Sequence, residues 1–156
     1  MFRLKHVRVI PIALAMLLAV TAPRAGWAAL GGDVTTVQDD AVRMKGSLRS
    51  TVSPSYTVHE ISASGGTMVR EYISPQGKVF GVSWRGPVLP DFQQLLSTYY
   101  SDFQQEVRSR DRRIRGPVVV QKPNVVIQSA GHMRNFMGRA YIPGSLPAGV
   151  TPGEIQ

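Results

Sequence analysis

The chain has 156 residues, of which 43% are hydrophobic, and its 18 Lys and Arg residues outnumber 10 Asp and Glu residues, giving a formal net charge of +8. This length suits one domain, and the apolar fraction is well above that of a disordered chain. No cysteine is present, which excludes a disulfide framework, a thiolate zinc site and a cysteine nucleophile. The chain also lacks the glycine patterns of a serine-hydrolase elbow, a Walker loop and a dinucleotide-binding turn.

The N-terminus has the layout of a cleavable secretory signal peptide. Basic residues in 1–11 precede the apolar run 12–20, and the small residues Gly26 and Ala28 suit the cleavage-site positions −3 and −1. The run is about half of the ~20 residues that a bilayer span needs, which disfavours an uncleaved anchor. We therefore predict that residues 1–28 are removed, that no transmembrane span remains, and that the protein is exported to the periplasm or the cell exterior.

Removal of this leader changes the charge of the part that folds. The leader contains four of the basic residues and none of the acidic ones, which leaves 14 basic and 10 acidic residues and a net charge of +4. This weakens the case for nucleic acid as a partner. A moderately basic exported domain is better suited to an acidic protein surface or to an anionic envelope component such as lipid or polymer.

The first predicted element after the leader is a short helix over about residues 36–48. Thr36 and Asp39 resemble a capping box, and apolar residues follow at helical spacing at Val37, Ala41, Met44 and Leu48. The segment before Pro54 ends this helix, because a residue that precedes proline is pushed out of the helical region.

Residues 56–85 are predicted to form a three-strand antiparallel meander. Turn sequences at 64–66 and 74–77 separate three β-rich runs, which are 56–61, 67–73 and 78–85. A three-residue loop at the first turn sets Glu60 opposite Arg70 and His59 opposite Glu71, whereas a two-residue loop would oppose the like charges of Glu60 and Glu71.

The same loop length at the second turn predicts three further cross-strand pairs, Tyr72 with Phe80, Arg70 with Val82 and Met68 with Trp84. Because side chains alternate along a strand, one face then carries seven residues that we expect to form the core. They are Tyr56, Val58, Met68, Tyr72, Phe80, Val82 and Trp84.

A longer helix is predicted over about residues 91–107. Asp91 is a suitable cap, and apolar side chains recur at steps of three and four at Phe92, Leu95, Leu96, Tyr99, Phe103 and Val107. We expect this stripe to cover the aromatic sheet face. Short β runs at 118–121, 125–129 and 134–142 extend the sheet. The prediction is a single α+β domain over 29–142, followed by a Pro/Gly-rich tail over 143–156.

Several stretches, considered as a set, resemble a known family. They are 29–32, 56–60, 69–72, 77–87, 90–91, 131–134 and 138–143. The set is similar to the small exported bacterial proteins catalogued as domain of unknown function 2844, and it spans nearly the whole mature chain. The resemblance implies export and a shared fold. That family has no assigned activity, catalytic residue or cofactor, so the resemblance implies no mechanism and we predict no cofactor.

His59, Glu71 and His132 are the one set of side chains suited to binding a metal or shuttling a proton. A catalytic zinc site needs three converging ligands, and nothing in the sequence brings His132 close to the hairpin. The simpler interpretation is a cross-strand His59–Glu71 pair that satisfies both groups. A small metal-dependent or hydrolytic enzyme therefore remains an alternative, with no metal or catalytic residue assigned.

Glu60 and Arg70 are expected on the aromatic face beneath a helix. A charge pair in such a position loses hydration and persists when it is hydrogen-bonded, so it marks either a ligand pocket or a structural bridge. The structural bridge is the favoured interpretation. His132 and Arg134, which follow Gly131, are candidates for a functional turn at the end of the sheet, although a plain hairpin connection is simpler.

A basic run follows the longer helix and consists of Arg108, Arg110, Arg112, Arg113 and Arg115. Guanidinium groups suit phosphate and carboxylate, so this run is a candidate site for anionic lipid, polymer or a protein partner. A solvated helix end is the simpler interpretation. The run has no interleaved aromatic residues of the kind that bind nucleic acid. The preferred functional hypothesis is an exported, envelope-associated, non-enzymatic binding or accessory module whose partner is unknown.

Overall fold

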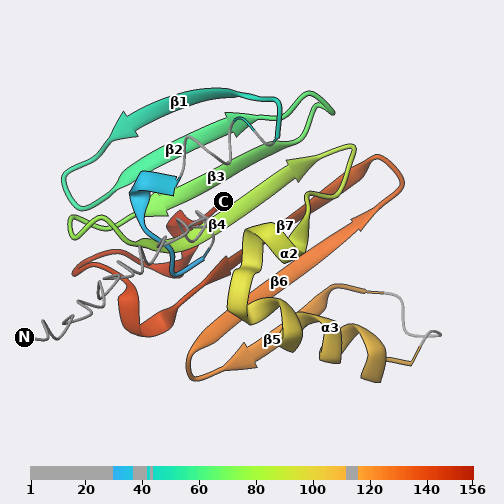
Figure 1. The fold of residues 1–156 in the computed structure, drawn as a ribbon. Coiled ribbons are helices and arrows are strands. Elements are labelled where there is room, and N and C mark those ends of the chain that lie inside the picture. The colour runs from blue at the N-terminus through green and yellow to red at the C-terminus, as the bar shows by residue number, and fades with distance from the viewer. Residues whose placement is uncertain (1–29, 37–41, 43, 112–115) are drawn as a thin grey trace, which may run out of the picture.

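A computed structural model describes residues 30–36, 42, 44–111 and 116–156. The chain forms a seven-stranded antiparallel sheet in the order β1-β2-β3-β4-β7-β6-β5 (Figure 1). The strands are β1 (Ser47–Val52), β2 (Thr57–Ser62), β3 (Met68–Ile73), β4 (Val79–Gly86), β5 (Val118–Lys122), β6 (Val125–His132) and β7 (Asn135–Tyr141). The predicted α+β class is confirmed.

The predicted longer helix is present as three consecutive pieces, α2 (Phe92–Leu96), η2 (Ser97–Tyr99) and α3 (Tyr100–Ser109). The Asp91 side chain begins it by accepting hydrogen bonds from the backbone N–H groups of Gln93 and Gln94. Short 3-10 turns complete the structure at η1 (Val34–Thr36), η3 (Pro143–Ser145) and η4 (Pro152–Glu154). In the described part of the chain, every helix is too short or too polar to cross a bilayer.

The helix predicted over 36–48 is wrong at its C-terminal end, where residues 47–48 begin β1. This edge strand pairs with β2 along its whole length. All six of its residues are exposed, so the segment lacks the alternation of buried apolar and exposed polar residues that would predict a strand. Its pairing with β2 therefore decides its structure. Most of the rest of the predicted helix, residues 37–41 and 43, lies outside the described residues, as does the predicted signal peptide over 1–28.

The predicted register of the first hairpin is confirmed, with His59 opposite Glu71 and Glu60 opposite Arg70. The second hairpin differs, because Ile73 pairs with Val79 whereas Tyr72 pairs with Gly81. A β-bulge therefore inserts one extra residue into β4. All three pairs predicted for this hairpin are displaced by one residue, and the observed pairs are Tyr72–Gly81, Arg70–Ser83 and Met68–Arg85.

The bulge divides the expected core face into two clusters. Val82 and Trp84 lie on the face covered by α2 and α3, which we call the helix face, where they pack with Ile61, Val69, Leu95 and Phe103. Phe80 lies instead with Tyr56 and Tyr72 on the opposite face, which we call the outer face. The helices therefore do not cover all seven residues that were predicted to form one core face.

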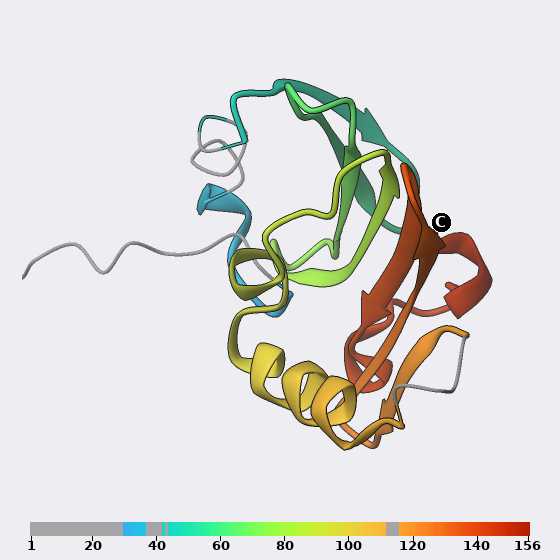
Figure 2. The same cartoon turned by 90° about the vertical axis from the view of Figure 1, so that its right-hand side faces the viewer.

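Residues 143–156 return along the outer face and cover its aromatic cluster. Ile155 is fully buried there against Tyr72 and Phe80. Figure 2 shows this arrangement edge-on, with α2 and α3 on one side of the curved sheet and the C-terminal segment on the other. The sheet is therefore covered on both faces, by elements that precede β5 and by elements that follow β7.

Candidate binding site on the outer face

One row of mainly polar side chains crosses the outer face over all seven strands. The cross-strand register links, in order, Arg49, Glu60, Arg70, Ser83, Arg139, Gln128 and Val119. Directly opposed residues of neighbouring strands lie about 5 Å apart and project from the same face. The row therefore places three arginines and one glutamate on a single line across the sheet.

The C-terminal segment lies across this row and is bound by its guanidinium groups. Arg139 donates from Nη1 to the Pro152 carbonyl oxygen at 2.7 Å and from Nε to Gln128 Oε1 at 2.9 Å. Arg70 Nη1 and the Tyr72 hydroxyl donate to the Gln156 carbonyl oxygen at 2.7 and 2.8 Å. Arg139, Arg70 and Tyr72 therefore hold the C-terminal segment through its main-chain carbonyl oxygens, at turn η4 and at Gln156.

Turn η4 shapes this segment through a capping box, in which the Glu154 carboxylate accepts from the Thr151 backbone N–H at 2.8 Å. That backbone hydrogen bond is the main reason that the pKa of Glu154 is lowered, with a further contribution from the Tyr56 hydroxyl. Burial raises the pKa of Tyr56, and its hydrogen bond to Glu154 raises it further. Glu154 therefore stays ionised. It joins the C-terminal segment to the start of β2 by accepting a hydrogen bond from the hydroxyl of Tyr56, the residue before that strand.

A groove of about 530 Å³, which we call the outer-face groove, lies beside the C-terminal segment. Its lining includes Ile155 and Gln156 together with outer-face residues of β4, β5, β6 and β7, among them Arg85, Val119, Gln128, Ala130, Met137 and Arg139. A second groove of about 400 Å³ is lined by Arg49, Thr51, Glu60, Arg70 and Glu154, among others. The two grooves share Gln156, so the C-terminal segment borders both of them.

The outer-face groove combines an unpaired cation with apolar surface. Arg85 is exposed, and its guanidinium makes no ion pair or hydrogen bond with any other described residue. Met137 lies directly between Arg85 and Ala130 in the register, and it is 37% exposed. Val119 on β5 is 41% exposed. This arrangement suits a ligand that carries an anionic group on an apolar body.

Comparison with known proteins places the chain in a family. Residues 26–155 match the family model described as "Protein of unknown function (DUF2844)". The chain belongs to the DUF2844 family. No curated protein and no solved structure matches it. The matched range includes the whole sheet and every lining residue of the two grooves except Gln156, so the family model spans most of the outer face of this DUF2844 protein.

The Glu60–Arg70 pair forms an ion pair of 2.9 Å between Glu60 Oε2 and Arg70 Nε. The hydrogen bond to Glu60 is the main reason that the pKa of Arg70 is raised. The expectation that a helix covers this pair is wrong, because the pair lies on the outer face beside the C-terminal segment. Its side chains are 26% and 38% exposed, so solvent screens the attraction, which contributes on the order of 1 kcal/mol or less.

His59 and Glu71 face each other on the helix face, and His132 lies far from both. β2 and β6 are separated by four strand steps of about 4.8 Å, or roughly 19 Å, and His132 is an exposed residue at the end of β6. Within the described ranges, no group of three His, Cys, Asp or Glu residues could hold a metal ion. The alternative enzyme hypothesis requires His59, Glu71 and His132 to converge, and in the structure these three side chains do not.

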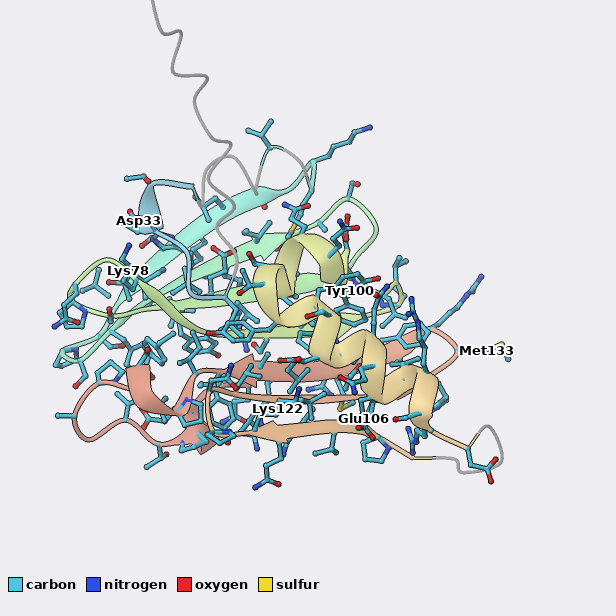
Figure 3. The ribbon with its side chains drawn as sticks, turned by 60° about the horizontal axis from the view of Figure 1, so that its bottom comes forward. Asp33, Lys78, Tyr100, Glu106, Lys122 and Met133 are labelled. Carbon is cyan, nitrogen blue, oxygen red and sulfur yellow. The ribbon has the colours of Figure 1, made fainter. Side chains whose placement is uncertain are left out.

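The remaining candidate residues are separate from the grooves. His132 and Asn135 flank the tip of the β6–β7 hairpin, where Arg134 has a φ of 62° and Met133 is 90% exposed (Figure 3). Arg108 is exposed in the last turn of α3, and Arg110 Nη1 donates to the Gly116 carbonyl oxygen at 2.8 Å. Arg112, Arg113 and Arg115 lie outside the described residues.

Sequence reasoning missed Arg85, Gln128, Met137 and Arg139. The alternation of β7 does place Met137 and Arg139 on one face and Ala140 on the other. That signal was present in the predicted strand over 134–142. It becomes informative only once β4 is known to lie beside β7, because this pairing brings Arg85 next to Met137.

The partly buried position of His59 predicts a pH dependence of stability. Burial lowers the pKa of His59 below its ordinary value of 6.5, and its Nδ1 atom is enclosed with no hydrogen-bond partner among the described residues. Below about pH 6.5 the unfolded chain takes up a proton that the folded chain does not, so stability is full above that pH and decreases below it. The groups opposite His59 are Ser50 and Glu71.

Urea unfolding of the wild type at pH 7.5 and pH 5.5 measures this loss. We expect it to be smaller in His59→Asn and unchanged in the matched variant His132→Asn, because His132 is exposed. An equal loss in the wild type and in His59→Asn would show that another group causes the pH dependence.

Proposed function

We propose that this DUF2844 protein is an exported, envelope-associated binding module without catalytic activity, and that the outer-face groove is its binding site. The observation that carries the proposal is the unpaired Arg85 guanidinium beside the exposed apolar surface of Met137 and Val119. A groove of this volume, apolar with a few polar groups, is typical of ligand sites. Export is supported by the basic, apolar and small-residue order of residues 1–28.

The chemistry of the groove favours a ligand with a carboxylate or phosphate attached to an apolar chain. Arg85 supplies a guanidinium fork, which suits either anion. Gln128 Oε1 accepts from Arg139, which leaves the amide N–H groups of Gln128 as donors toward the same groove. Met137, Ala130 and Val119 supply the apolar contact. An anionic component of the cell envelope can supply both the anionic group and the apolar chain.

The test uses decanoate and decyl phosphate as anionic probes and decanol as the neutral probe, each titrated against ¹⁵N-labelled protein. We expect the anionic probes to shift the amide resonances of β4, β6 and β7, and decanol to bind more weakly. Arg85→Glu should weaken binding of the anionic probes by about tenfold or more, because it opposes like charges and loses roughly 1.4 kcal/mol or more.

Arg134→Glu provides the matched control, since it makes the same charge change at the exposed tip of the β6–β7 hairpin. Arg108→Glu tests the basic run in the same way. Equal losses in Arg85→Glu and Arg134→Glu would show a response to net charge alone. A loss confined to Arg108→Glu would move the anion site to the end of α3. Either result would contradict the proposed use of the groove.

A further inference from the structure

The two edges of the seven-stranded sheet differ in how they are protected. At one edge, β5 is flanked by Pro117 and Pro123, and Lys122 Nζ contacts Asp102 Oδ1 of α3 at 2.8 Å. Figure 3 shows α3, with Tyr100 and Glu106 labelled, running beside the strand that carries Lys122. Prolines, an edge lysine and a covering helix are devices that natural proteins use to prevent edge-to-edge pairing. The β5 edge is therefore protected.

The opposite edge, β1, is less protected: the nearest lysine and proline, Lys45 and Pro54, each lie two residues outside the strand, and no described helix covers it. β1 is the first strand of the sheet order and so forms an edge, and Figure 1 shows it at the upper margin of the ribbon. It contains no proline and no lysine, and all six of its residues are exposed. Val52 is 79% exposed and Leu48 is 37% exposed. β1 therefore has an open edge that includes apolar side chains.

The hairpin geometry identifies which backbone groups of β1 point outward. The Ser53 backbone N–H donates to the Tyr56 carbonyl oxygen at 2.8 Å, so Ser53 and Tyr56 form a hydrogen-bonded pair. Hydrogen-bonded and non-hydrogen-bonded pairs alternate along an antiparallel ladder. The pairs formed by Val52, Ser50 and Leu48 with β2 are therefore of the non-hydrogen-bonded kind. The N–H and C=O groups of these three residues point away from β2 and are available to another strand.

We propose that β1 pairs in antiparallel fashion with β1 of a second copy of this chain, centred on Ser50. Leu48, Ser50 and Val52 must then pair with one another, because only these residues have outward backbone groups. Centring on Ser50 places Leu48 opposite Val52 of the second copy and Arg49 opposite Thr51 of the second copy. Centring on Arg49 instead would oppose two like charges, which is unfavourable. Centring on Thr51 would set Leu48 opposite Pro54, which lies beyond the end of β1 and has no N–H to pair.

This pairing would join the two sheets into one and cover the exposed side chains of Leu48 and Val52. Three hydrogen-bonded pairs would exchange about six backbone hydrogen bonds. Arg49 and Thr51 both line the second groove, and the proposed register sets Arg49 of the second copy directly opposite Thr51. Each copy would thereby contribute one guanidinium to the margin of the other copy's groove. The proposal does not depend on the function assigned to the outer-face groove.

Disulfide crosslinking tests both the dimer and its register, because the chain has no cysteine of its own. In the proposed register, Ser50 faces Ser50 of the second copy with a Cα–Cα distance of about 5.5 Å, within the range of a disulfide. Ser50→Cys should therefore crosslink with itself under mild oxidation. Val52→Cys is the matched control on the same edge. It should not crosslink with itself, because the two Val52 positions lie about 14 Å apart along the strands, but it should crosslink with Leu48→Cys.

Light scattering coupled to size-exclusion chromatography gives the mass of the uncrosslinked protein. We expect a concentration-dependent dimer for the wild type and a monomer for Ser50→Pro. The N–H of Ser50 points outward, so its loss leaves the β1–β2 ladder intact, and the circular dichroism spectrum checks that the fold is retained. A monomeric wild type at every concentration would overturn the proposal and leave the edge for a strand of another protein. A dimer unaffected by Ser50→Pro, or equal self-crosslinking of Ser50→Cys and Val52→Cys, would also overturn it.

Discussion

Replacement of Ile155 by alanine is expected to lower the free energy of unfolding by about 2–5 kcal/mol. Ile155 is fully buried although it is the second-to-last residue of the sequence. It packs with Tyr72 and Phe80 and lies over Gly81, where a Cβ would come within 2.8 Å of its Cδ1 atom. Truncation to alanine therefore removes a buried side chain and leaves a cavity between the C-terminal segment and the sheet.

Urea unfolding followed by circular dichroism measures this change. Met133→Ala is the control, because Met133 is 90% exposed and its truncation should alter stability by about 0.5 kcal/mol or less. If Ile155→Ala had the same small effect as Met133→Ala, the C-terminal segment would not be part of the folded core in solution. Ile155 would then also not line the outer-face groove in solution.

Replacement of Gly138 by alanine is expected to destabilise the protein by about 3 kcal/mol. A Cβ at this position would overlap the Trp84 ring and the Gln128 carbonyl oxygen. Gly138 pairs directly with Trp84, so the absence of a side chain allows the indole to lie across β7 and pack against Phe92 at a centroid distance of 5.1 Å. The added methyl group would meet the β6 backbone on one side and the buried Trp84 ring on the other. Neither group can move away at low cost, because both are closely packed.

Gly144→Ala is the matched control, because a Cβ there meets no atom within 4 Å. It should change stability by only about 0.5 kcal/mol. Thermal unfolding of both variants, followed by tryptophan fluorescence, tests the expectation. Gly138→Ala should also shift the emission of Trp84, since the ring is 2% exposed and would have to move. Wild-type emission and stability in Gly138→Ala would contradict the packing of Trp84 across β7.

Several features were predictable because neighbouring residues encode them. The periodicity of Leu95, Leu96 and Phe103 predicted the helix that covers the sheet, and all three are buried in its core. The first hairpin register followed from the cost of opposing Glu60 and Glu71. Turn chemistry and charge pairing act within about ten residues, so the sequence contains the information directly.

Other features were missed because distant segments decide them. The turn at 74–77 did not reveal the bulge, which places Phe80 and Val82 on opposite faces. Alternation predicts that two side chains share a face but not what covers that face. The aromatic cluster of Tyr56, Tyr72 and Phe80 is covered by Ile155 rather than by a helix, and the Tyr72–Gln156 contact spans 84 residues.

The sequence by itself determined the α+β class, the three strands of the first meander and the pairing of Glu60 with Arg70, since period and turn type are local properties. Only the tertiary structure decided the outer-face groove. Its residues come from β4, β5, β6, β7 and the C-terminal segment, and the antiparallel pairing of β4 with β7 brings Arg85 beside Met137. The sheet order and the return of residues 143–156 create this site, and both depend on burial between segments far apart in the chain.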